Sequence, residues 1–419
     1  MIDCIFNPKS VAVIGATDNS SKWGNWISED LLKHKHIRNV YLIKQNQLIS
    51  DIPEPLYLAV VCVPVAQFET VIDQLLEHGT KAIIGITTGF SEKGEQELEQ
   101  RIIDKVRAKG SILIGPNCAG IWDAYSPIHC LPIGDFNKGE VGVISQSGGV
   151  IVDLANRLKE VNVGYSRVIS TGNQNGIELK DLIENLANDQ HTKVIAMYCE
   201  DVKKIPFEYI NTVQKPIILF VPWATPAAIR AAKNHTNSDL TIALNVARNM
   251  MDFTAAIQFA LSNQSRPKGR RTMLVSDTGG FGVIMSTSAE FNGLLIDEPS
   301  DTLKEQLRQV VSKQSTISNP IDLVGSSAGF TQSLVDVMNI LQKSDEVDNI
   351  IMNIHLETED SSGYMYGSLL AQEVMMGKKA TIFTCFRFNT PGVKALLDWK
   401  MPVYRDADVA AAIMSMICN

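Results

Sequence analysis

The stretch VAVIGATDNSSKWG, residues 11–24, marks the start of an α/β fold. Its first residues are apolar and mostly β-branched, which favours a buried strand that ends at Gly15. A small polar turn leads from there to Gly24, near the start of a helix. Glycine lets the backbone approach a phosphate, and N–H groups at the start of a helix favour negative charge. The stretch therefore fits a nucleotide or coenzyme site, although an ordinary strand–helix turn also explains it.

The same rhythm continues along the whole chain and predicts parallel sheets covered by helices. Short apolar runs that end at Gly or Pro alternate with amphipathic segments, which is typical of βαβ units. The expected strands of the first sheet are VAVIG (11–15), LAVVCVP (58–64), KAIIGIT (81–87) and ILIGP (112–116). Those of the second are EVGVIS (140–145), YSRVIS (165–170), KVIAMY (193–198) and KPIILFVP (215–222). Those of the third are RTMLVSD (271–277), DNIIMNI (348–354), ATIFTCF (380–386) and MPVYR (401–405).

Three α/β domains follow from this grouping, over residues 1–127, 128–264 and 265–419. The segment SNQSRPKGR (262–270) is polar and contains Pro and Gly, so it is interpreted as a linker. A length of 419 residues is ample for three domains, each large enough to bury a core.

Composition narrows the classes of function. The formal net charge of −8 argues against broad binding of nucleic acid or anionic membranes. The seven cysteines form no CxxC pair, and no Cys/His spacing indicates a metal site. We see no signal peptide and no run of about 18 apolar residues, so we expect no membrane span and a cytoplasmic protein.

Three further motifs, each a strand followed by a turn, place polar groups where ligands of open parallel sheets bind. In IGPNCAGI (114–121), Asn117 and Cys118 come directly after a strand; Cys118 lacks an identifiable base and fits a packed thiol better than a nucleophile. VISQSGG (143–149) and VSDTGGFG (275–282) each lead into a helix whose first N–H groups could hold an anion. The candidate phosphate-binding residues are Ser145, Ser147, Gly148, Gly149, Gly279 and Gly280. A purely structural turn remains an alternative for each motif.

A histidine and a glutamate complete the set of candidates. His235 lies in the polar segment RAAKNHTNS (230–238), where it is either a solvated loop residue or a nucleophile that accepts a phosphoryl group. Glu200 ends the apolar run in MYCEDV (197–202). Its carboxylate could accept the other imidazole N–H and fix the tautomer, or it could be a solvated acid.

The order of the motifs resembles that of a known family. NPKSVAVIGAT, VCVP, TTGFSEKG, IGPNCAGI, ISQSGG, STGNQ, MYCED, NHT, DTGGFGV and NPIDLVG follow one another as in the α-type part of NDP-forming acyl-CoA synthetases, of the acetate and succinate type. This resemblance covers nearly the whole chain. It implies a Rossmann-like CoA-binding domain followed by two flavodoxin-like parallel-sheet domains.

The resemblance also implies roles for individual residues. His235 matches the phosphorylated histidine of the family's SHTG signature, and Glu200 matches the glutamate that supports it. The SQSGG and DTGGFG turns match two helices whose N-termini point at the phosphohistidine. Coenzyme A would contact residues of the first domain: Gly15, Thr17, Asp18, Asn19, Ser20, Ser21, Lys44, Val63, Pro64, Thr87, Thr88 and Asn117.

No ATP-grasp domain follows in this sequence, so the resemblance implies a separate ATP-grasp β-type subunit that binds ATP or ADP with Mg²⁺. The substrate would be a small carboxylic acid or its acyl-CoA, in an oligomeric enzyme. The signature reads NHTN here, with Asn237 in place of Gly. That departure keeps open a non-catalytic CoA- or acyl-CoA-binding module. An NAD(P) site is weaker, because Lys44 stands where a dinucleotide site would need an acid.

Overall fold

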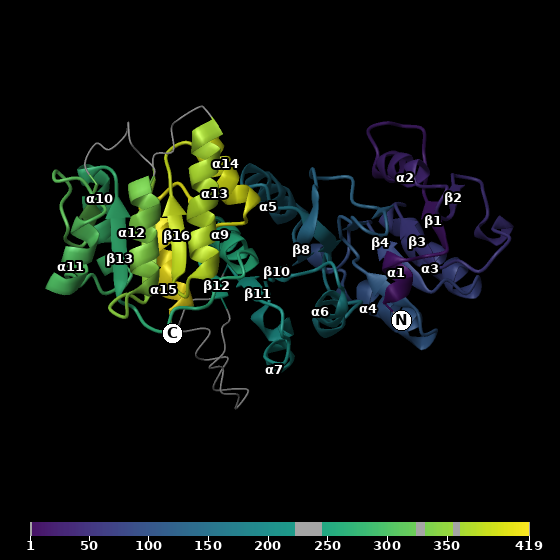
Figure 1. Cartoon of the computed structure of the whole chain (residues 1–419). Helices are drawn as coiled ribbons and strands as arrows, with labels where there is room; N and C mark the ends of the chain where they lie inside the picture. The colour runs from purple at the N-terminus through teal and green to yellow at the C-terminus, as the bar shows by residue number, and fades with distance from the viewer. Residues whose placement is uncertain (1, 223–244, 324–331, 355–360, 419) are drawn as a thin grey trace. The chain divides into compact units, whose positions relative to one another are not determined.

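The structure is a computed structural model that describes residues 2–222, 245–323, 332–354 and 361–418 (Figure 1). The chain divides into two compact units, Met1–Val246 and Ala247–Asn419. The first unit contains two β-sheets, and the second unit contains a third. The edge strand β12 (Asn245–Ala247) of the second sheet lies at the boundary between the units in the sequence. His235 lies outside the described residues.

The first sheet has five parallel strands in the order β2-β1-β3-β4-β5, the arrangement of a doubly wound fold. Successive residues of β1 point to opposite faces of the sheet and belong to two different cores. Val11 and Val13 pack in one core, and Ala12 and Ile14 pack in the other. All four expected strands are confirmed. The elements are α1 (Asp3–Phe6), β1 (Ser10–Ile14), α2 (Trp23–Lys33), β2 (Asn39–Ile43), η1 (Ile49–Asp51), β3 (Leu58–Val61), α3 (Val65–Glu77), β4 (Ala82–Gly85), η2 (Ser91–Lys93), α4 (Gln96–Ala108) and β5 (Ile112–Ile114).

The second sheet has seven strands in the order β12-β11-β10-β8-β9-β6-β7. Its expected strands are confirmed, and a short hairpin, β6–β7, adds two antiparallel strands at one edge. The hairpin spans the predicted boundary at 127/128, which stays a prediction. The elements are β6 (Ile121–Asp123), β7 (Ile128–His129), β8 (Lys138–Ser145), α5 (Gly148–Glu160), β9 (Tyr165–Ser170), α6 (Leu179–Asn188), β10 (Val194–Tyr198), η3 (Val202–Lys204), α7 (Phe207–Ile210) and β11 (Ile217–Phe220).

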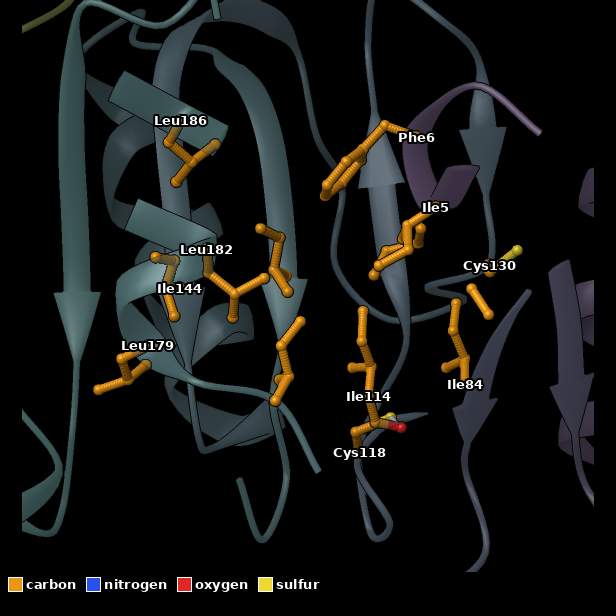
Figure 2. Close-up of a cluster of buried hydrophobic side chains, with 14 of the residues drawn as sticks. Ile5, Phe6, Ile84, Ile114, Cys118, Cys130, Ile144, Leu179, Leu182 and Leu186 are labelled. Carbon is orange, nitrogen blue, oxygen red and sulfur yellow. Dashed lines mark hydrogen bonds between the residues drawn. The ribbon is translucent and has the colours of Figure 1, made fainter. Parts of the chain in front are cut away.

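One buried apolar cluster joins the first two sheets. Figure 2 shows Ile84 and Ile114 of the first sheet in the same cluster as Ile144 of the second and Leu182 of α6. All four side chains are fully buried. Because apolar burial is the main stabilising contribution to folding, this shared cluster explains why both sheets form a single unit.

The third sheet is parallel, with strand order β14-β13-β15-β16-β17, and its expected strands are confirmed. The expected linker 262–270 packs against it: the Gln264 side chain bonds both the N–H and the C=O of Thr381. The boundary at 264/265 stays a prediction. The elements are α9 (Met250–Leu261), β13 (Thr272–Ser276), α10 (Gly279–Phe291), α11 (Asp301–Arg308), β14 (Ile321–Asp322), α12 (Gln332–Lys343), β15 (Asn349–Asn353), α13 (Ser361–Met376), β16 (Ala380–Thr384), α14 (Pro391–Asp398), β17 (Val403–Tyr404) and α15 (Ala407–Ile417).

A buried polar network links α4 to the loop after β9. Glu99 is only 2% exposed, and its carboxylate accepts hydrogen bonds from Ser91 N–H at 2.9 Å, Asn173 Nδ2 at 2.9 Å and Asn175 Nδ2 at 2.7 Å. Asn173 in turn accepts a hydrogen bond from Asn117 Nδ2 at 3.0 Å. The network therefore holds a predicted site residue in place from both sheets.

The substitution Glu99→Gln should lower the free energy of unfolding by about 1–3 kcal/mol, because an NH2 group would replace an acceptor that faces three donors. Urea denaturation measures this change. Glu97→Gln on the same helix is the matched control, since Glu97 is exposed, and it should stay within about 0.5 kcal/mol of the parent. Equal stabilities of the two variants would contradict a structural role for the network.

Candidate functional site

The turn after β1 brings two backbone segments unusually close together. Gly15 has φ +92°, a conformation that favours glycine, and a Cβ built on it would lie 2.7 Å from the Cys62 carbonyl oxygen. A Cβ built on Gly24 of α2 would overlap the carbonyl oxygen of Gly15. Helix α2 thus packs directly on the turn, and both glycines singled out in the sequence are required by this contact.

The polar residues of this turn hold one another. Asn19 N–H donates to Thr17 Oγ1 at 3.2 Å, and Ser21 N–H donates to Asn19 Oδ1 at 3.0 Å. Lys44, at the end of β2, forms an ion pair with Asp18 at 2.7 Å. Both side chains are largely exposed, so the pair contributes little to stability. A phosphate that reached Lys44 would have to compete with Asp18.

A cavity of about 770 Å³ connects this turn to the N-terminus of α5. Ten predicted residues line it, drawn from both the coenzyme and the phosphate sets: Gly15, Thr17, Ser21, Val63, Pro64, Thr87, Thr88, Asn117, Gly148 and Gly149. Nine lining residues are not among the predicted coenzyme or phosphate contacts, although Gly24 and Cys118 lie in motifs singled out in the sequence. They are Lys22, Trp23, Gly24, Cys62, Val65, Ile86, Cys118, Ala119 and Ile133. Most of these neighbour predicted residues in the sequence, which could have suggested them. Of the predicted coenzyme-binding residues, Asp18, Asn19, Ser20 and Lys44 do not line the cavity.

Two thiols of the cavity wall, those of Cys62 and Cys118, are unreactive near neutral pH. Burial raises the pKa of Cys62 and of Cys118 to about 12 each. Cys118 Sγ also donates to the Gly85 carbonyl oxygen at 3.3 Å. Because the thiolate is the nucleophile, both groups are inert near neutral pH, which favours the packed-thiol interpretation. Among the described residues, no group of three or more His, Cys, Asp or Glu side chains could hold a metal ion.

The N-terminus of α5 presents free donors to the cavity. Ser147 is the N-cap: its Oγ accepts the Val150 N–H at 3.3 Å, and its own N–H donates to Ser145 Oγ at 3.1 Å. The first N–H groups of a helix have no intrahelical acceptor, so those of Gly148 and Gly149 are available to a ligand. This end of the helix can therefore stabilise an anion at the cavity wall.

Glu200 lies beside the same turn. Its N–H donates to the side-chain oxygen of Gln146, and its Oε1 accepts the Tyr198 hydroxyl at 3.2 Å. Burial, with Glu200 as a further cause, raises the pKa of Tyr198 to about 12, so the phenol remains a donor. The structure thus brings Glu200 and the SQSGG turn together, as sequence position alone could not show.

The turn before α10 repeats the geometry of the turn before α5. Ser276 Oγ donates to the Thr278 carbonyl at 2.8 Å and accepts the Thr278 N–H at 3.2 Å, as Ser145 does with Ser147. A Cβ built on Gly279 would lie 2.9 Å from Asp322 Oδ2, while one on Gly280 would meet open space. The pattern S-x-S/T-G-G therefore encodes the same turn twice, once in each unit.

A larger cavity, of about 990 Å³, contains none of the predicted residues. Its two arginines are already engaged by acids: Arg167 pairs with Asp123 at 2.6 Å, and Arg107 lies 3.6 Å from Glu178. Five carboxylates line it, Asp3, Glu178, Asp181, Glu184 and Asp189. A negatively charged cavity does not suit a phosphorylated coenzyme, so the smaller cavity is the better candidate site.

Comparisons with known proteins show which domain families the first two sheets resemble. A family model for a CoA binding domain matches residues 9–123, and one for a succinyl-CoA ligase like flavodoxin domain matches residues 138–257. The α subunit of an ADP-forming acetate–CoA ligase from Pyrococcus furiosus is 27% identical over all of this chain and 97% of its own length. A solved Pyrococcus horikoshii structure superposes with a TM-score of 0.83 at 26% identity, covering 100% of this chain and 98% of that one.

The chain matches a smaller share of a longer relative. The ADP-forming acetate–CoA ligase of Methanocaldococcus jannaschii is 30% identical over 76% of this chain, and the match spans only 49% of the relative. The chain thus covers nearly all of one relative and about half of the other. No helix in the described ranges is long and apolar enough to cross a bilayer.

The fold and the two family models define an α/β protein in which a CoA-binding domain precedes a succinyl-CoA-ligase-like domain. The chain belongs to the NDP-forming acyl-CoA synthetases, a family of acid–thiol ligases, and it is of their α-subunit type. The comparisons lend no support to the alternative of a non-catalytic module.

Proposed function

We propose that this chain is the α-type subunit of an enzyme that converts a carboxylic acid, CoA and ATP into acyl-CoA, ADP and phosphate. The observation that carries the proposal is the single cavity that joins the turn after β1 to the N-terminus of α5. A coenzyme bound at the turn can place its thioester beside the N–H groups of Gly148 and Gly149, which can donate hydrogen bonds to an anion. The larger cavity, beside Arg107 and Arg167, is lined by neither of these elements.

In the direction of thioester cleavage, the reaction divides into two steps on this chain. Phosphate attacks the acyl-CoA carbonyl, the C–S bond breaks, and acyl phosphate and CoA result. An imidazole nitrogen of His235 then attacks the phosphorus, and the acid leaves as carboxylate. The N-terminus of α5 would stabilise the phosphate charge by roughly 0.3–2 kcal/mol. The phosphohistidine then gives its phosphoryl group to ADP, and thioester formation is the reverse of this sequence.

The individual residues take distinct parts in this scheme. The turn containing Gly15, Thr17 and Ser21, with Asn117 opposite, would bind the coenzyme. Lys44 would bind one of its phosphates as a point charge, once released from Asp18. Glu200, oriented by the Tyr198 hydroxyl, would accept an imidazole N–H of His235 and select its reactive tautomer. Ser145 and Ser147 shape the turn that exposes the two glycine N–H groups.

The remaining chemistry belongs to a second polypeptide. We propose an ATP-grasp β-type subunit that binds ADP or GDP with Mg²⁺, so that the active enzyme is an oligomer in the cytoplasm. Bound Mg²⁺ would there neutralise phosphate charge. On this chain we propose a CoA-binding domain over 1–127, a domain carrying the phosphohistidine loop over 128–264 and a second CoA-ligase domain over 265–419.

Two measurements test the proposal. Calorimetry on the purified chain should detect binding of CoA, and the chain mixed with an ATP-grasp β-type protein should form acyl-CoA and ADP only when acid, CoA and ATP are all present. The chain and the partner alone are the controls. Binding of CoA without turnover, in a mixture that forms a stable complex, would contradict an enzymatic role.

A further inference from the structure

Three small or apolar residues line the cavity beside the N-terminus of α5 and contact one another closely. A Cβ built on Gly148 would lie 3.1 Å from Ile133 Cδ1 and 3.3 Å from Ala119 Cβ, tighter than ordinary van der Waals contact. All three residues line the cavity. The space between Gly148 and these two side chains is therefore too small for an added methyl group unless a neighbour shifts.

The acyl group would lie beside these three residues, a step that rests on the function proposed above. The developing oxyanion and the incoming phosphate need donors, and the N–H groups of Gly148 and Gly149 are the ones that the cavity offers at α5. An acyl chain extends from the same carbonyl carbon. Its first carbons must therefore pack against Ala119 and Ile133.

The small number of charged side chains in the cavity lining indicates which acyl groups can bind. Lys22 is the one charged side chain among the residues that line the cavity in the described part of the chain. It lies at the N-cap of α2, on the side of the coenzyme turn. A second carboxylate on the acyl group would lose its hydration near α5 without gaining a cationic partner.

We propose that Ala119 and Ile133 determine specificity by limiting the acyl group to short, uncharged chains. Ile133 is the more discriminating of the two, because its Cδ1 reaches furthest toward Gly148. Ile133 belongs to no motif of the sequence, and Ala119 lies within IGPNCAGI (114–121), where no role was assigned to it. Both act through shape, since differences of one or two methylene groups are what an apolar wall can distinguish.

Calorimetry on the purified full-length chain tests this with CoA, acetyl-CoA, hexanoyl-CoA and succinyl-CoA. In the parent, hexanoyl-CoA and succinyl-CoA should bind at least roughly tenfold more weakly than acetyl-CoA. Ile133→Ala should recover most of that loss for hexanoyl-CoA but not for succinyl-CoA. Each acyl-CoA affinity is compared with that of CoA for the same variant, and urea denaturation reports that each variant is folded. Ile133→Leu, of equal volume, is the matched control and should keep the discrimination.

A second pair of variants checks the contact itself. Gly148→Ala should weaken binding of acetyl-CoA, and adding Ile133→Ala to it should restore binding, because the added methyl group then has room. An identical chain-length profile in the parent and in Ile133→Ala would overturn the inference while leaving the proposed function intact. A parent chain that binds no CoA would overturn the proposed function, and this inference with it.

Discussion

Substituting His235 with asparagine should abolish transfer of radioactive phosphate from γ-labelled ATP to this chain in the presence of an ATP-grasp partner. Asparagine resembles histidine in size and polarity, but its amide nitrogen is not a nucleophile, so no phosphoramidate can form. We expect a loss of at least ~100-fold in both label and turnover. The parent label should be labile in acid and stable in base, as a phosphohistidine is.

Two further variants make this experiment specific. His36→Asn changes an exposed histidine of the first sheet domain and should label like the parent. Glu200→Gln removes the carboxylate that would support the imidazole and leaves the acceptor, so label should appear more slowly but reach the same level. Undiminished label in His235→Asn would show that another residue carries the phosphate, and the proposed mechanism would then be wrong.

The strands and the two glycine turns could be predicted from the sequence because each is encoded locally. Runs such as VAVIG are apolar on both faces, as a strand between two layers of helices must be. The pattern S-x-S/T-G-G specifies its turn through a hydroxyl two residues before the N-cap. The hairpin β6–β7 escaped prediction since its strands have three and two residues, too few to show a period.

The parts that could not be predicted depend on contacts between distant residues. Lys44 and Asp18 are separated by 26 positions and meet only because β1 and β2 are neighbours. The apolar wall at Ile133 comes from a loop with no pattern of its own. The segment 262–270 has the composition of a linker, yet Gln264 is bonded to β16. Composition indicates the local backbone preference of a segment, but it does not indicate which distant residues the segment will contact in the folded protein.

Substituting Gly24 with alanine should destabilise the first unit and abolish CoA binding, although intrinsic preference predicts the opposite. Alanine favours a helix interior over glycine by roughly 0.5–1 kcal/mol. The added Cβ would overlap the Gly15 carbonyl oxygen, a backbone atom that cannot rotate away. Relieving the overlap moves α2 or the turn, and overpacking of this kind costs about 1–3 kcal/mol. The steric cost should therefore exceed the gain in helix preference, so that the variant is less stable. The displaced turn should also lower the affinity for CoA by at least ~100-fold.

Gly280→Ala is the matched control, because Gly280 also occupies the second position of its helix and a Cβ there meets open space. Urea denaturation should show a gain of up to about 1 kcal/mol for Gly280→Ala and a loss for Gly24→Ala. Calorimetry with CoA then separates local from global damage, since Gly24→Ala should lose binding even at low urea where it remains folded. If Gly24→Ala instead gained stability and bound CoA normally, the close contact between α2 and the turn would not exist in the molecule, and the cavity would lose its defining wall.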